Sequence, residues 1–139
     1  MNEIDRILDE IEEKVEEFRR ELLEEARRYL ESQASLLFKT EGKSLRVDWK
    51  PVKEAYLKWK IKKGFSEKTL HKTTTLAQSF HGEVKKEEIV FGTPVKYVAF
   101  HEEGTSKMPA RPIFKPLVED LSENIPELVS LISKELFGV

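Results

Sequence analysis

The first 41 residues contain neither proline nor glycine, and this feature restricts the fold of the chain more than any other. Steps of four and three residues separate the apolar positions there, which places them along one face of an α-helix: Ile4, Leu8, Ile11, Val15, Phe18 and Leu22. A helix over residues 3–38 would be about 54 Å long, which exceeds the width of a domain of 139 residues. We therefore expect part of this apolar stripe to project from the body or to pack against another copy. A break near Ser32–Ser35, with two shorter helices folded together, is the alternative.

The remaining sequence predicts helices around a small antiparallel sheet. Residues 43–49 fit either a short strand or an extended arm, and residues 51–64 fit a helix that ends at Gly64. The segments SFHGEV and EIVFGT predict a β-hairpin with a charged tip, after a polar loop over residues 65–75. A short helix ending at Gly104 and a C-terminal helix follow, and Pro126 after Asn124 predicts a kink or a restart in the latter.

These elements fit one α+β domain over residues 1–139. Its parts would be a long N-terminal helix over residues 1–40, an α+β body over residues 43–121, and a C-terminal helix over residues 122–139. We expect the C-terminal helix to pack on the small sheet, because an amphipathic helix needs an apolar face to cover.

The charge is distributed unevenly although the net charge is only -2. Residues 1–31 carry twelve Asp/Glu and six Lys/Arg, whereas residues 43–72 carry ten Lys/Arg and three Asp/Glu. The pattern fits two solvated faces of opposite sign, but also head-to-tail contact between copies or contact with nucleic acid. The acidic N-terminus predicts no signal peptide, and no apolar run approaches the roughly 18 residues of a membrane span.

The side chains that carry chemistry do not form a known catalytic or metal-binding pattern. The chain has no cysteine, and His101-Glu102 lacks a second histidine four residues on, where Thr105 stands. His101 with Glu102 or Glu103 could act as an acid–base pair, but no nucleophile or oxyanion motif accompanies them. We therefore expect no metal, no cofactor and no enzymatic activity, and we interpret His101 as a polar residue that hydrogen-bonds locally near a helix end.

Nucleic-acid binding is the alternative function that the sequence supports. Residues 50–72 hold eight lysines interleaved with Tyr56, Trp59 and Phe65, which suits neutralisation of phosphates and stacking on bases. Tyr56 and Trp59 share one helical side with Val52, however, which favours their burial in the core. The sequence predicts no sequence-specific DNA contact.

Several short motifs follow one another in a fixed order between residues 47 and 121. They contain, in chain order, Trp49, Pro51, Leu76, Ser79, Gly92, Tyr97, His101, Gly104, Pro109, Arg111, Pro112 and Phe114. In this order the motifs resemble those of phage virion-morphogenesis proteins, the Mu-like tail-completion family, which is related in pattern to the lambdoid neck proteins that connect head and tail. Two positions depart from the family pattern: Thr74 stands where a glycine is usual, and Val98 stands where an alanine is usual.

The resemblance implies a structural virion component rather than an enzyme. Such proteins act at the neck or the tail terminus as rings of several copies, in contact with neighbouring neck or tail-tube proteins. The resemblance places them in the virion, and in the host cytoplasm during assembly, without a membrane.

The stretch FHEEGTSKMPARPIF, residues 100–114, contains six of these twelve motif residues. Its two prolines stiffen the loop and push Met108 and Arg111 towards extended conformations, which lowers the entropy lost on docking. Arg111 could offer its planar guanidinium to a carboxylate of its own chain or of an adjacent copy in a ring. The alternative is that Arg111 anchors its own loop through backbone carbonyls or through Glu102 or Glu103.

Overall fold

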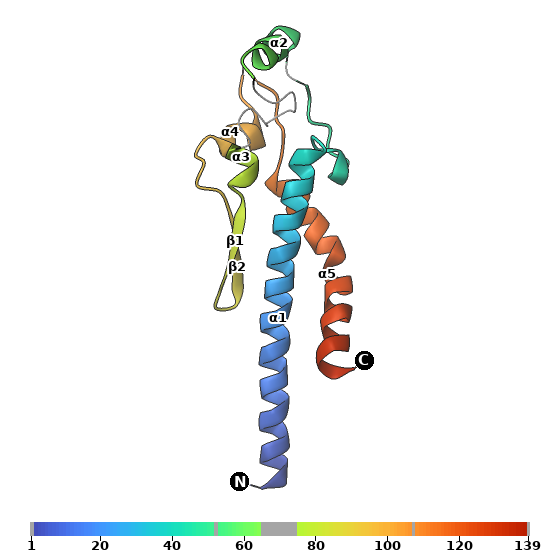
Figure 1. Ribbon diagram of the computed structural model, residues 1–139. Coiled ribbons are helices and arrows are strands. Elements are labelled where there is room, and N and C mark those ends of the chain that lie inside the picture. Colours follow the sequence, from blue (N-terminus) through green and yellow to red (C-terminus); the bar gives the residue numbers. More distant parts are fainter. Residues whose placement is uncertain (1, 52, 65–74, 107, 139) are drawn as a thin grey trace.

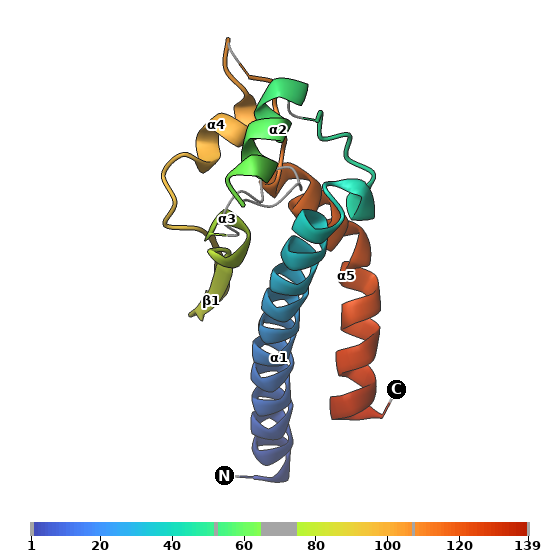
Figure 2. The ribbon, with the colours of Figure 1, turned by 45° about the horizontal axis from the view of Figure 1, so that its top comes forward.

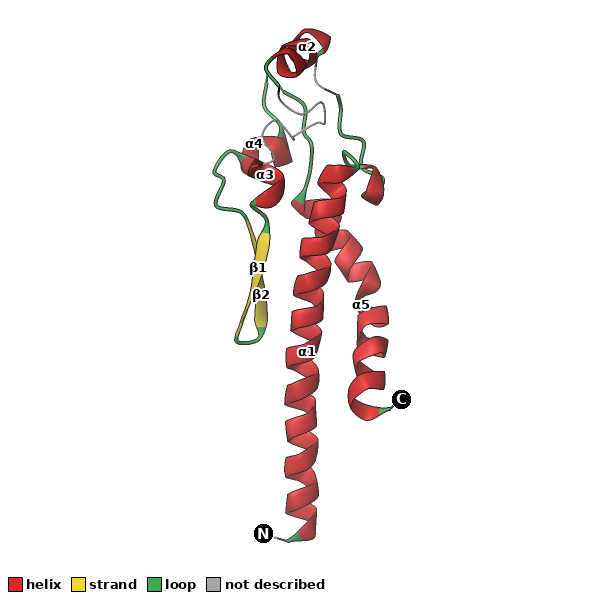
Figure 3. Ribbon diagram, viewed as in Figure 1, coloured by secondary structure: helices red, strands yellow, loops and turns green. Residues whose placement is uncertain are grey.

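One long helix, α1 (Glu3–Lys39), spans most of the length of the molecule in the computed structural model (Figure 1). The structure describes residues 2–51, 53–64, 75–106 and 108–138, so most of the predicted loop over residues 65–75 lies outside the described residues. Besides α1, five helices are described: the 3-10 helix η1 (Lys43–Leu45), α2 (Glu54–Lys62), α3 (Thr75–Gln78), α4 (Val98–Glu103) and α5 (Phe114–Phe137). The hairpin strands are β1 (His81–Lys85) and β2 (Glu88–Gly92), which confirms the α+β class (Figure 3).

The signals that begin and end α1 lie outside the helix itself. The Asn2 side chain accepts a hydrogen bond from the Asp5 backbone N–H at 2.8 Å, and acidic residues occupy the first turn. At the other end Gly42 has φ +93°, and its N–H donates to the Leu37 carbonyl at 2.9 Å. A Cβ at Gly42 would lie 2.6 Å from the Val47 carbonyl oxygen, so the turn requires glycine. The helix does not break near Ser32–Ser35, and the continuous alternative is confirmed.

The apolar stripe of α1 is buried over its C-terminal half and exposed over its N-terminal half. Leu30, Ala34 and Leu37 belong to the core, whereas Ile4 is 67% exposed and Ile11 is 53% exposed. The N-terminal end of α1 extends past the end of α5 in both views (Figures 1 and 2). The prediction that part of the stripe projects from the body is therefore confirmed, and its contact with another copy stays a prediction.

The core lies where the C-terminal end of α1 meets the hairpin, the first turn of α5 and an irregular arm over residues 47–51. Phe38 is fully buried, and its ring centroid lies 5.4 Å from that of Trp49 and 5.5 Å from that of Phe80. Phe114 at the start of α5 contacts both Phe80 and Phe91 of the hairpin. The arm is extended only after η1, so the short-strand alternative for residues 43–49 is wrong.

The C-terminal helix packs along α1 rather than on the sheet, which corrects our expectation in this detail. The start of α5 contacts the hairpin, through Phe114 on Phe91, while the two-stranded sheet rests against α1. The Tyr29 hydroxyl of α1 donates to Asp120 at 2.7 Å, and Phe18 contacts Phe137 near the far end of α5. The α1 face that α5 covers thus ends near Phe18 and Lys14.

The same helix is less interrupted than the sequence predicts. It begins at Phe114, where the helical pattern of the sequence also begins, and it joins the segment 122–139 to the body by continuing through Pro126 without a restart. Asn124 is not a cap, because its side-chain amide donates to the Asp120 carbonyl one turn earlier, at 2.8 Å. Packing along α1 offsets the backbone hydrogen bond that Pro126 removes.

Replacing Tyr29 with phenylalanine is expected to lower stability by about 1 kcal/mol through loss of its hydrogen bond to Asp120. Burial and the Asp120 carboxylate raise the pKa of Tyr29 from 10.0 to about 12. The contribution of the Tyr29 hydroxyl to stability is full below pH 10. It is lost as the pH rises through the pKa of Tyr29 in the folded protein, because the phenolate is disfavoured only in the fold. Thermal unfolding of both proteins between neutral pH and pH 12 measures the difference, and equal pH dependences would contradict the prediction.

Candidate functional site

The Pro-Ala-Arg-Pro segment is held between α4 on one side and the arm over residues 47–51 on the other. The Arg111 backbone N–H donates to the His101 carbonyl at 2.6 Å, which ties the segment to α4. Thr105 and Met108 pair as an isolated β-bridge, with the Thr105 N–H on the Met108 carbonyl at 2.9 Å. On the arm side, Trp49 Nε1 donates to the Pro112 carbonyl at 2.8 Å. We call residues 108–113 with these contacts the clamped segment.

Gly104 makes this arrangement possible where α4 ends. Its N–H donates to the Phe100 carbonyl at 2.9 Å, and its φ is +76°, in the left-handed region. A Cβ there would lie 2.7 Å from the Ala110 backbone nitrogen. Glycine therefore lets the clamped segment return directly against the end of α4.

Arg111 anchors its own loop through a backbone carbonyl, as one of the two sequence interpretations expected. Its side chain is buried, with 5% of the residue exposed, and Nε donates to the Lys50 carbonyl at 2.7 Å. Burial lowers the pKa of Arg111 below its ordinary value, because desolvation disfavours the charged form. The guanidinium is therefore not presented to a carboxylate on a neighbouring copy.

The role of Glu102 at this site is one that sequence reasoning missed. Its carboxylate accepts the backbone N–H groups of Ile113 at 2.7 Å, Phe114 at 2.8 Å and Lys115 at 3.2 Å. These are first-turn donors of α5 without partners inside the helix, so Glu102 caps α5 from another element. The only sequence signal is indirect: Ile113, at the N-cap position, has no side chain that could cap the helix. A carboxylate occupied in this way is not placed to act with His101 as an acid–base pair.

His101 is half-buried, and its environment differs from our expectation of a side chain that hydrogen-bonds locally. Its backbone carbonyl accepts from Arg111, but within the described part of the chain its buried Nδ1 has no hydrogen-bond partner. The ring packs edge-on to Tyr97 with centroids 5.7 Å apart. Burial, and secondarily the charge of Arg111, lower the pKa of His101 below 6.5.

We expect acid to destabilise the fold through His101. Because the pKa of His101 is lower in the folded than in the unfolded protein, the neutral imidazole contributes its full stability above pH 6.5. That stability is lost as the pH falls through the pKa of His101 in the folded protein. The melting temperature of the protein should therefore fall more steeply below pH 6.5 than that of a His101→Gln variant. Parallel curves for the two proteins would show that His101 does not titrate differently in the fold.

The other motif residues divide into buried and exposed groups. Leu76 and Trp49 are core residues, and the Ser79 hydroxyl donates to the Leu76 carbonyl at 2.6 Å while it contacts the Thr93 hydroxyl. Pro112 and Phe114 are half-buried beside them. Gly92 ends β2 with open space where a Cβ would lie. The exposed members are Pro51, Tyr97 and Pro109. The structure thus brings most of the predicted residues into one supporting network and leaves few of them at the surface.

An apolar hollow of about 310 Å³ lies on α4 beside the clamped segment. Phe100 is 58% exposed and Tyr97 is 47% exposed, which is unusual for aromatic side chains that serve only the core. We call this surface the aromatic hollow; it is lined by Tyr97, Phe100, His101, Thr105 and Met108. Exposed aromatic side chains around a hollow are typical of protein–protein contact sites.

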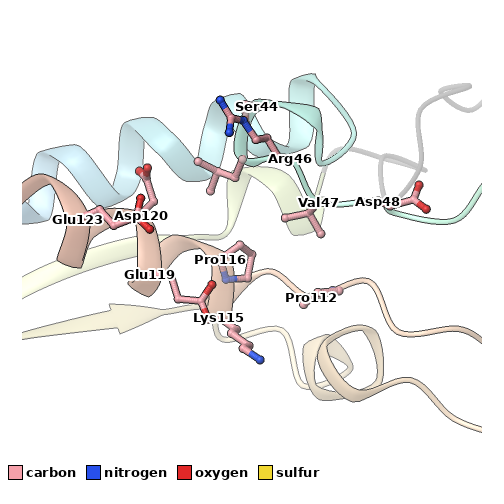
Figure 4. A pocket seen from close by; sticks show the side chains of 11 residues that line it. Ser44, Arg46, Val47, Asp48, Pro112, Lys115, Pro116, Glu119, Asp120 and Glu123 are labelled. Atoms are coloured by element: carbon pink, nitrogen blue, oxygen red, sulfur yellow. The ribbon is translucent and has the colours of Figure 1, made fainter.

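A second, more open groove of about 740 Å³ runs between residues 44–48 and the N-terminal half of α5. Figure 4 shows its charged side chains spread along the groove, with Asp48 towards one end and Glu123 towards the other, rather than converging on one point. Among the described residues, no three or more metal-ligating side chains lie together. Within the same ranges, no helix is both long enough and apolar enough to cross a membrane.

The basic helix α2 stands at the opposite end of the molecule from the N-terminus (Figure 1). Tyr56 is 42% exposed and Trp59 is 40% exposed, and their rings stack with centroids 5.7 Å apart. The expectation that these aromatics belong to the core is therefore wrong. They pack on each other, because α2 is set away from the main core beyond the arm.

Comparison with known proteins gives matches along nearly the whole chain. The chain is 28% identical over 129 residues to an uncharacterized protein of Methanocaldococcus jannaschii, covering 88% of this chain and 95% of that protein. No solved structure gives a significant match. Residues 1–130 match the phage virion morphogenesis family, so the match includes α1 as well as the motif region. The clamped segment lies within the matched residues, as do Gly104 and Glu102. The chain therefore belongs to the phage virion morphogenesis family.

Proposed function

We propose that this protein is a structural assembly protein of a phage or prophage that acts at the neck or the tail terminus. It would complete the tail or join head to tail through contacts between copies arranged in a ring. The observation that carries the proposal is the family match over residues 1–130, which spans the elements of both the body and the projecting helix. The expected location is the virion, with the host cytoplasm as the place of assembly.

The division of the molecule into a rigid body and exposed apolar surfaces supports an assembly role. The clamped segment, Arg111 and Glu102 hold α4, the arm and α5 together, so these residues build a stiff scaffold. The aromatic hollow and the N-terminal half of α1 carry large apolar side chains at the surface. A preorganised body with such surfaces loses little entropy on docking to a neighbouring neck or tail-tube protein.

Electron microscopy of lysates tests the proposal directly, after deletion of this gene from the phage or prophage that carries it. We expect filled heads beside separate, abnormal or overlong tails. Restoration of joined virions by the intact gene supplied in trans is the control. Normal joined virions in the deletion strain would contradict the proposed role.

A second function, nucleic-acid binding through residues 43–72, is favoured by one observation. The exposed, stacked pair Tyr56 and Trp59 lies on a helix rich in lysine, which suits backbone neutralisation with base stacking. Titration with single- and double-stranded DNA at two salt concentrations tests it. Tight binding that weakens steeply with salt would favour this second function over a purely protein-binding role.

A further inference from the structure

The N-terminal part of α1 is an apolar stripe bordered by negative charge. Over residues 3–17, which we call the acidic tip, the chain carries eight Asp/Glu and two Lys/Arg. Its exposed apolar residues continue the face that α5 covers further along α1, since Phe137 at the end of α5 contacts only the C-terminal edge of the tip, at Lys14, besides Phe18. The acidic tip therefore presents a helix face that continues an existing helix–helix interface, and within the described chain α5 contacts it only at Lys14. Its exposed apolar members are Ile4, Ile7, Leu8, Ile11 and Val15.

The opposite end of the molecule has the complementary character. Residues 50–63 carry six lysines, of which all but the buried Lys60 are exposed, and one glutamate. Tyr56 and Ile61 are 42% and 48% exposed. We call this surface the basic end; it is formed by Lys50, Lys53, Tyr56, Ile61, Lys62 and Lys63. Figures 1 and 2 place α2 and the N-terminus at opposite ends of α1, so one copy cannot bring its own two surfaces together.

We propose that the acidic tip of one copy docks on the basic end of the next copy, as a heterologous head-to-tail contact. The inference rests on the proposed assembly role and names the surfaces that it would use. Apolar side chains of the tip would cover Tyr56 and Ile61, while the flanking carboxylates would face the lysines of α2. Because the two surfaces differ, a docked pair still has one free tip and one free basic end, which is what a ring or a helical array requires.

Charge decides between this partner and the simplest competitor, a coiled coil between two acidic tips. Pairing two tips would bring sixteen acidic and four basic side chains into one contact, from eight and two in each copy. Like charges across an interface are costly, whereas the basic end supplies the opposite sign. An α2 surface that also carries exposed aromatic and aliphatic side chains matches the tip in both charge and apolar character.

Two variants of the full chain separate the head-to-tail contact from its competitors. The tip variant carries Leu8→Gln and Ile11→Gln, and the α2 variant carries Tyr56→Ala and Lys62→Glu. Each variant removes one surface and leaves the other intact, and all four positions are exposed, so the fold is retained. The matched controls are Val90→Gln, an exposed apolar position on β2, and Lys96→Glu, an exposed lysine outside both surfaces.

Analytical ultracentrifugation at increasing protein concentration gives the readout. The unmodified chain should form assemblies larger than dimers, and each variant alone should associate about thirtyfold more weakly, as expected for loss of about 2 kcal/mol at a contact hot spot. An equimolar mixture should recover association but stop at a dimer, because the only intact pair of surfaces joins one copy of each variant. The two controls should assemble like the unmodified chain.

Other results would overturn the proposal. If the α2 variant assembles normally while the tip variant does not, the tips pair with each other. If the unmodified chain is monomeric at every concentration, the contact does not form, whereas the assembly role would still be decided by the deletion phenotype. If the α2 variant associates normally but loses DNA binding, the basic end serves nucleic acid instead.

Discussion

Replacing Arg111 with alanine is expected to lower the stability of the fold by about 2–4 kcal/mol. The change removes a charge-assisted hydrogen bond of 2.7 Å and leaves the Lys50 carbonyl without that donor. It also removes a long side chain from a position that is only 5% exposed, so packing is lost as well. Thermal and chemical unfolding should therefore report a lower melting temperature in a protein that still folds.

Arg111→Lys is the informative companion, because an ammonium lacks the guanidinium geometry that reaches the carbonyl from this position. We expect it to recover little of the lost stability. Lys96→Ala, at an exposed lysine, is the surface control and should change stability by less than about 0.5 kcal/mol. An unchanged melting temperature together with loss of assembly would place Arg111 in an interface, contrary to its contacts here.

The parts of the fold that the sequence predicted are those with strong local signals. The alternating steps of α1, the glycine after α4 and the two apolar segments of the hairpin each specify an element within a short stretch of chain. Gly42 and Gly104 then gain a physical reason, since a side chain at either would collide with backbone atoms. Local periodicity and turn chemistry therefore carried most of the architecture.

The parts that were wrong depend on which elements meet in space. The sequence shows that α5 has an apolar face, but not that the hairpin already occupies α1 beside it. Tyr56 and Trp59 have core-like spacing, yet α2 stands away from the core. Periodicity identifies a helix face without naming the surface that covers it: in α2 the buried position is Lys60, whereas Tyr56 and Trp59 stay exposed.

The candidate site shows the same limit at the level of single residues. From the sequence, the side chain of Arg111 was equally suited to bind a carboxylate of a neighbouring copy or a backbone carbonyl of its own chain. In the structure it is buried and its Nε donates to the Lys50 carbonyl. Glu102 was considered only as an acid or as a partner of Arg111, because a cap supplied from twelve positions before the helix has no local signature. The motif residues thus serve mainly the scaffold, which leaves the contacts with other proteins to exposed residues outside the motifs.

Replacing Glu102 with alanine should cost about 2–3 kcal/mol, because three backbone N–H groups at the start of α5 lose their acceptor at once. The negative charge of the carboxylate also interacts favourably with the positive N-terminal end of the dipole of α5, a helix of 24 residues. Glu102→Gln, which keeps an acceptor but loses the charge, should therefore recover only part of the stability.

Glu103→Ala is the matched control for this change, since Glu103 is the exposed neighbour on the same helix, and it should leave the melting temperature nearly unchanged. Hydrogen exchange gives the local readout: the N–H groups of Ile113, Phe114 and Lys115 should lose protection in Glu102→Ala before the rest of α5 does. Equal protection of these three groups in both proteins would mean that α5 begins without help from α4. Loss of protection confined to these three groups would establish that the short helix α4 holds the start of α5 in place. Glu102 would then also help to position the face of α5 that packs on α1.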